Sequence, residues 1–169
     1  MIACDWQIAG AHVVEPFDME RVNPASIDLC LGDGAYDLMN AHTIGGDVLR
    51  LIPGVVVLVT TLETVTLPDY YAGQLVLKSS MGRRGVSMPA AGWVDPGFSG
   101  TLTVQLSACV PVVLTVGQPF IQMILHRMAG VPDKLYQGKY QGQQGVTLER
   151  QEDITAEVIE KYQERVAGK

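Results

Sequence analysis

The chain has 169 residues, of which 47% are hydrophobic, and it carries a net charge of −6. A single domain of this size can bury a core without disulfides or a structural metal. The acidic balance excludes a nonspecific nucleic-acid surface, because binding to a phosphate backbone requires clustered Lys and Arg.

Residues 14–22 (VEPFDMERV) are expected to form a short helical turn that ends before Asn23-Pro24, because proline restricts the residue before it. Between residues 47 and 116, short runs rich in Val, Thr and Leu alternate with Gly- and Pro-containing turns, which predicts strands. The runs are VLRLI, VVVLVTTLETVTL, GQLVLKS, GTLTVQLSA and VPVVLTV. This pattern predicts a mainly β fold, either a barrel or a sandwich.

Two C-terminal segments differ from this pattern. Residues 136–147 (YQGKYQGQQGVT) are rich in Gly, Gln and Tyr without an apolar period, so we expect them to be disordered or ordered by something they bind. Residues 152–166 place apolar side chains near helical spacing with charges between them, which predicts an amphipathic helix.

The three cysteines, Cys4, Cys30 and Cys109, form no CxxC pair and indicate neither a disulfide framework nor a zinc site. The N-terminus has no basic and apolar leader, and the apolar run at residues 55–59 is too short to span a bilayer. We therefore expect reduced thiols, a cytoplasmic location and no membrane partner.

Two short segments concentrate groups that can carry chemistry. The first, KSSMGRRG at residues 78–85, combines cations, hydroxyls and open backbone N–H groups, and is either a phosphate cradle or a basic surface turn. The second, AGWVDPGFSG at residues 91–100, contains Asp95 before Pro-Gly. An Asp in this context is more often a turn former than a general base, so context has to decide its role.

The ordered series KSSMGRRG, AGWVDPGFSG, VGQPFIQ and KYQGQQG resembles the motif series of the dCTP deaminase and trimeric dUTPase superfamily. Upstream, NPASIDLCLG and TLETVTLP are similar to segments of the deaminase branch, so the resemblance spans about residues 23 to 147. It implies a distorted β-barrel that forms homotrimers, with sites at subunit interfaces and Mg²⁺ bound with the triphosphate. Residues 1–147 would then form the nucleotide-binding domain, including a lid at 136–147, and residues 148–169 a helical extension.

The resemblance also assigns roles to single residues. Ser79 and Ser80 would contact phosphates, and Lys78 stands where the family usually has Arg, which keeps the charge but loses the bidentate fork. Arg83 matches the arginine beside the reacting base in deaminases, and Gln122 matches a glutamine that reaches phosphate.

Asp95 matches the catalytic carboxylate of the dUTPase branch, which orients the attacking water, and Phe98 matches a ring that packs against deoxyribose. Further substrate contacts implied by the resemblance are Ala91, Gly92, Trp93, Tyr136, Lys139 and Gln143.

Gln105 departs from the deaminase pattern, in which the matching strand carries a Glu that shuttles protons between water and the cytosine ring. A carboxamide has no proton to exchange near neutral pH, so it cannot act as general acid or base. The alternative interpretation is a half-buried strand residue whose amide is satisfied locally.

These observations predict a deoxypyrimidine triphosphate hydrolase, most simply a dUTP diphosphatase that also accepts dCTP. The alternatives are a zinc-independent dCTP deaminase and a non-catalytic nucleotide-sensing homologue. Zinc-dependent deamination is excluded because the chain lacks HxE with PCxxC. His12, His42 and His126 match no metal spacing, so surface or structural roles are expected for them.

Overall fold

Strands dominate the part of the chain that the computed structural model describes, residues 1–89 and 92–149. The elements in chain order are α1 (Asp5–Ala11), β1 (Val14–Glu15), the one-turn helix η1 (Met19–Arg21), β2 (Val22–Asn23), β3 (Ser26–Asp37), β4 (His42–Ile44), β5 (Val48–Leu51), β6 (Val57–Thr66), β7 (Tyr71–Leu77), α2 (Ser79–Arg83), β8 (Val86–Ser87), β9 (Trp93–Val94), β10 (Ser99–Ala108), β11 (Val112–Thr115) and β12 (Pro119–Arg127).

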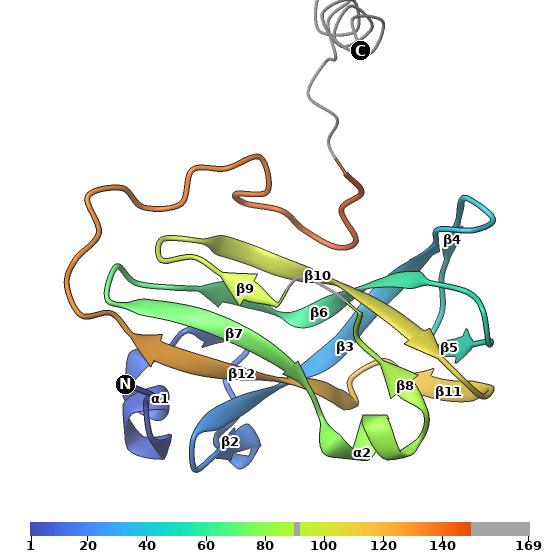
Figure 1. The fold of residues 1–169 in the computed structure, drawn as a ribbon, viewed down its shortest axis with the longest axis horizontal. Helices are drawn as coiled ribbons and strands as arrows, with labels where there is room; N and C mark the ends of the chain where they lie inside the picture. The colour runs from blue at the N-terminus through green and yellow to red at the C-terminus, as the bar shows by residue number, and fades with distance from the viewer. Residues whose placement is uncertain (90–91, 150–169) are drawn as a thin grey trace, which may run out of the picture.

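The main sheet has the order β8-β10-β6-β3-β12-β7-β9, with β1 on β6 and with β2 and β4 on β3. It curls on itself into a distorted barrel (Figure 1), and β5 and β11 form a separate pair. The expected mainly β, barrel-like fold is confirmed. Among the described residues, no helix is long and apolar enough to cross a membrane.

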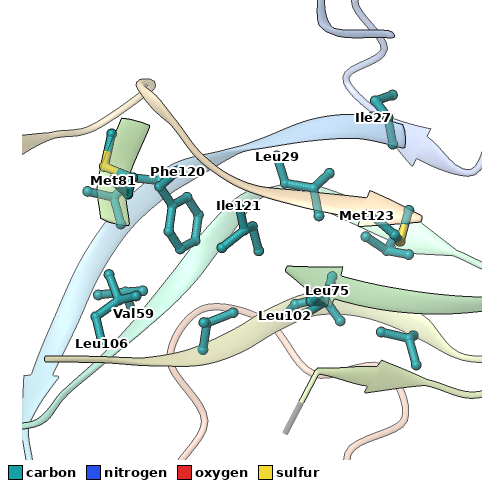
Figure 2. Packing of buried hydrophobic residues seen from close by; sticks show 14 of the residues in the cluster. Ile27, Leu29, Val59, Leu75, Met81, Leu102, Leu106, Phe120, Ile121 and Met123 are labelled. Carbon is teal, nitrogen blue, oxygen red and sulfur yellow. The ribbon is translucent and has the colours of Figure 1, made fainter. Parts of the chain in front are cut away.

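The core lies inside the curled sheet, where β3, β6, β7, β10 and β12 contribute buried aliphatic side chains (Figure 2). Phe120 and Ile121 are fully buried, and Met81 from α2 closes one end of the cluster in the close-up view. Burying each such side chain stabilises the fold by about 1.5–3 kcal/mol relative to exposure. This packing provides a rigid support for the loops at the sheet edges.

The predicted strand runs are confirmed as β5, β6, β7, β10 and β11. Two long strands, β3 and β12, were not predicted. In β3 the sequence SIDLCLGDGAYD contains Asp and Gly, which strands disfavour. Strand β12 begins with Pro119 and carries the polar residues Gln122 and His126. Their central positions in the sheet override these local preferences.

The helical turn expected at residues 14–22 is confirmed in part, as η1 at Met19–Arg21, preceded by the two-residue strand β1. Helix α1 was not predicted. Its capping box uses Cys4, whose backbone N–H donates to Gln7 Oε1 at 3.1 Å, in place of the Ser or Thr that marks helix starts in sequences. The C-terminal helix expected at residues 152–166 lies outside the described residues.

Candidate functional site

A cavity of about 640 Å³ opens between β10, the turn after β9 and the C-terminal segment that crosses above them. Its volume falls in the range of small-molecule sites. Several residues singled out from the sequence line it, namely Trp93, Asp95, Phe98, Gln105, Tyr136 and Gln143.

Gln105 reaches this cavity because of its position in β10. Val104 and Leu106, its neighbours along the strand, are 1% and 0% exposed and point into the core, so the alternation of a strand turns Gln105 to the other face. Among the described residues, no group forms a hydrogen bond with its carboxamide. The structure thus gives no support to a locally satisfied amide, and it leaves the amide available to a ligand.

Asp95 lies at the start of the Asp-Pro-Gly turn that joins β9 to β10. The turn is closed by the Phe98 N–H, which donates to Asp95 O at 3.2 Å, and Gly97 supplies the positive φ of +83° that it needs. The side chain accepts a hydrogen bond from Trp93 Nε1 at 3.0 Å. Asp95 is therefore both the turn former and a carboxylate exposed to the cavity.

Phe98 and Tyr136 form the aromatic part of the wall, with ring centroids 5.7 Å apart. Gly92 precedes β9 at a point where a Cβ would meet Leu75 O at 2.6 Å, so only glycine allows β9 to approach β7 this closely. Ala91 lies outside the described residues.

The lid segment, residues 136–147, is ordered by β10 itself, which differs from the expected disorder or ordering by a bound partner. Thr101 N–H donates to Gln143 O at 3.0 Å, and Gln143 Nε2 donates back to Thr101 O at 2.7 Å. Gly142 N–H donates to Ser99 O at 2.8 Å. The Gly- and Gln-rich composition supplies backbone and carboxamide partners for a neighbouring strand in place of apolar side chains.

Gln143 is 7% exposed and thus anchors the lid segment. Lys139 does not line the cavity; its Nζ lies 3.9 Å from Glu149 Oε1 and 5.4 Å from the centroid of the Tyr140 ring.

The residues assigned to phosphate binding, and Arg83, which was matched to the arginine beside the reacting base, lie elsewhere. Lys78, Ser79, Ser80, Arg83 and Gln122 do not line the cavity. In Figure 1, α2 lies at the lower edge of the molecule and the lid segment crosses the upper edge. Within one chain, the structure therefore does not bring these residues to Asp95 and Gln105.

Lys78 and Gln122 converge on Asp28, a residue that the sequence analysis gave no role. Lys78 Nζ forms an ion pair with Asp28 Oδ2, while Gln122 Nε2 and Asn23 Nδ2 donate to Asp28 Oδ1 at 3.2 Å and 2.9 Å. We call these residues, with Ser26, the Asp28 cluster. In the sequence, only the SIDL string could have pointed to Asp28. The role of this Asp was missed because β3, the strand that contains it, was not predicted.

The backbone of KSSMGRRG is not open throughout as expected, because α2 forms at Ser79–Arg83. Met81 and Gly82 N–H groups both donate to Lys78 O, at 2.9 Å and 3.2 Å, and Arg84 donates through its side chain to Val113 O. Ser79, Ser80 and Arg83 remain exposed on this helix.

Besides the cavity and the Asp28 cluster, the barrel contains a buried set of polar contacts around Glu63. Glu63, 1% exposed, accepts from Arg21 Nη1 at 2.7 Å and from the Cys30 N–H at 2.9 Å. Burial, together with the neighbouring Glu63 charge, raises the pKa of the Cys30 thiol to about 12. This arrangement joins β3, β6 and η1 and lies away from the cavity lining.

Cavity residues missed from the sequence include Tyr36, Leu58 and Thr103. Gln105 in β10 pairs with Leu58 in β6, and Leu58 pairs with Tyr36 in β3. Gln105, Leu58 and Tyr36 therefore lie in one row across the sheet. Finding them required the order of the strands, which local sequence patterns do not provide.

Comparison with known proteins shows the family and the fold of the chain. Residues 34–128 match the family described as dCTP deaminase-like. The chain is 35% identical over 155 residues to a dCTP deaminase of Thermococcus gammatolerans, covering 89% of this chain and 97% of that protein. It is 36% identical over 169 residues to a dUMP-forming dCTP deaminase of Salinispora arenicola, covering 84% and 88%.

Two solved structures share the fold. The 2′-deoxycytidine 5′-triphosphate deaminase of Agrobacterium tumefaciens aligns with a TM-score of 0.67 and 22% identity over 75% of this chain, and the chain spans about half, 48%, of its length. The dUTPase of EIAV aligns with a TM-score of 0.50 and 20% identity, covering 76% of this chain and 94% of that one.

Proposed function

The chain belongs to the dCTP deaminase-like family, and on this premise we propose that it hydrolyses a deoxypyrimidine nucleoside triphosphate, releasing diphosphate. The preferred substrate is dUTP, which would yield dUMP, and dCTP is the second substrate to test. The proposal depends on one observation, that Asp95 and Gln105 line the same cavity.

The two side chains support different chemistry. Asp95 offers carboxylate oxygens that can align a water molecule for attack at the α-phosphorus, after which the bond to the bridging oxygen breaks and diphosphate leaves. By the sequence resemblance, Gln105 matches the position at which family deaminases carry their proton-shuttling Glu. A carboxamide donates and accepts hydrogen bonds but does not exchange a proton near neutral pH, so it can bind a base edge without deaminating it.

Phosphate binding is proposed to come from a second copy of the chain. Ser79, Ser80 and Arg83 are exposed and lie away from the cavity, and among residues 1–89 and 92–149 no Lys or Arg lines it beside Asp95. A homotrimer whose copies pair α2 with the cavity of a neighbour would complete the site. Variants Asp95→Asn and Ser80→Ala, each inactive alone, should then regain activity when mixed as subunits.

Magnesium belongs to the proposal through the substrate. Among residues 1–89 and 92–149, no three His, Cys, Asp or Glu side chains come together as a metal site. Phosphate oxygens are ligands that Mg²⁺ prefers, and the bound ion would neutralise charge on the departing diphosphate.

A cytoplasmic location is also proposed, in keeping with the free thiols of Cys4, Cys30 and Cys109.

The relatives named dCTP deaminase favour a second candidate, zinc-independent deamination of dCTP. One chromatogram separates the two: the protein is incubated with Mg²⁺ and either dUTP or dCTP, and nucleotide products, diphosphate and ammonia are measured. Formation of dUMP and diphosphate from dUTP, without ammonia from dCTP, supports the diphosphatase. Ammonia release by the wild type would contradict the role given to Gln105, and Gln105→Glu tests whether deamination can be restored.

A further inference from the structure

Trp93 makes the hydrogen bond that holds the Asp95 carboxylate. Its indole Nε1–H donates to Asp95 Oδ1 at 3.0 Å, and no other described residue donates a hydrogen bond to this side chain. Trp93 is 58% exposed and lines the cavity together with Asp95. A tryptophan this exposed contributes little to the core, so its effect should lie in what the ring and its N–H contact.

The indole is itself held in place from two strands. In the sheet, Trp93 pairs with Gln74 of β7, and its ring lies against the ring of His126 in β12, with centroids 5.7 Å apart. His126 Nε2 and Gln74 Oε1 are 2.8 Å apart and form a hydrogen bond. The support therefore runs from β12 and β7 through Trp93 to the carboxylate on the turn.

We propose that Trp93 is a positioning residue for Asp95, whose N–H occupies one carboxylate oxygen and fixes the side chain so that the other oxygen meets the attacking water. The inference rests on the proposed function. An exposed Asp on a turn samples several rotamers, and catalysis is sensitive to small misplacements of an aligning group. The indole restricts this sampling without using both oxygens.

Trp93→Phe tests this role because it keeps an aromatic ring against His126 and removes only the N–H donor. We expect kcat for dUTP hydrolysis to fall about tenfold, as for loss of one hydrogen bond to a charged group, with KM changed less than about twofold. The matched control is Trp6→Phe, since Trp6 on α1 is 71% exposed and does not line the cavity. It should retain wild-type kinetics.

A raised KM with unchanged kcat would overturn the inference, because Trp93 would then bind nucleotide and not position Asp95. Unchanged kinetics in Trp93→Phe would also overturn it while leaving the proposed function intact.

A second measurement is independent of turnover. The chain has two tryptophans, so a proton–nitrogen NMR spectrum contains two indole N–H signals, and Trp6→Phe identifies that of Trp93. In Asp95→Ala the Trp93 signal should move upfield and lose protection from exchange, while the Trp6 signal stays. An unmoved Trp93 signal would overturn the inference even if the enzyme is active. If the wild type fails to hydrolyse nucleotides, the proposed function fails, and this signal alone decides whether Trp93 holds Asp95.

Discussion

Two carboxylates in this protein have opposite surroundings. Asp28 is matched by the ammonium of Lys78 and by the amides of Gln122 and Asn23, and its side chain is 12% exposed. Asp95 lies on an exposed turn beside a cavity and accepts one described hydrogen bond, from Trp93. A carboxylate has about four acceptor sites, so Asp28 has most of its capacity filled, whereas Asp95 keeps capacity for a ligand.

This difference indicates that Asp28 stabilises the fold, whereas Asp95 is available to take part in the reaction. Partners that neutralise a carboxylate hold neighbouring strands together, and they leave it little capacity for substrate. The contrast predicts that changes at Asp95 act on turnover and changes at Asp28 act on the free energy of unfolding.

The largest effect is expected for Asp95→Asn. The amide keeps the size of the side chain but cannot take up a proton or carry the charge that orients water, so kcat for dUTP hydrolysis should fall by about 10²–10⁴-fold. Thermal unfolding should change little, because the side chain is exposed. If the variant retained near wild-type kcat, Asp95 would have no catalytic role, and the proposed difference between Asp95 and Asp28 would be wrong.

Gly100→Ala should have the next largest effect, because it disturbs the lid segment. Gly100 has a φ of +149°, and a Cβ there would meet Gln143 O at 2.7 Å, on the strand that orders this segment. We expect the lid segment to detach, with about a tenfold loss of kcat/KM, since lids complete and enclose such sites. Limited proteolysis should cut within residues 136–147 faster than in the wild type. Gly45→Ala is the control, because Gly45 has no positive φ, has open space around an added Cβ and does not line the cavity.

The sequence predicted much of the barrel but little of how its parts meet. Strands β5, β6, β7, β10 and β11 follow from local apolar patterns, while β3 and β12 do not, because their Asp, Gly and Pro residues are tolerated only through tertiary pairing. Whether such segments form strands depends on the neighbouring strands, which the local sequence does not specify.

The candidate site shows the same limit. Asp95 and Gln105 were singled out by motif and lie in one cavity, but the sequence could not indicate that Lys78 and Ser79 would lie away from it. Nor could it indicate the role of Asp28, which depends on β3 lying beside β12. The geometry between segments distant in sequence had to come from the fold.

Asp28→Asn tests the other half of the contrast. Removing the charge leaves the Lys78 ammonium without its partner in a largely buried place, so the free energy of unfolding should fall by about 1–3 kcal/mol. Chemical denaturation measures this directly. The loss of kcat should be far smaller than in Asp95→Asn. Equal stability of wild type and variant would show that the Asp28 cluster does not hold β3 to β12 and to Lys78 at the start of α2.

The smallest effect concerns a third acidic residue, Glu63, and the thiol beside it. Because burial raises the pKa of Cys30 to about 12, its reactive thiolate is scarce in the folded protein at about pH 8. DTNB should therefore modify Cys109, which is exposed, and leave Cys30 unmodified until the protein unfolds. Because Cys4 is partly exposed, the control is the double variant Cys4→Ser/Cys109→Ser, which should abolish the fast reaction.

The same pKa shift predicts how stability depends on pH. In the unfolded chain Cys30 ionises near its ordinary value of 9.0, whereas in the folded protein it stays protonated up to about pH 12. The unfolded state therefore loses a proton first, and the free energy of unfolding should fall as the pH rises from about 9 towards 12. Cys30→Ala should weaken this dependence. An equal pH dependence in wild type and variant, or fast labelling of Cys30 at about pH 8, would contradict the burial of this thiol beside Glu63.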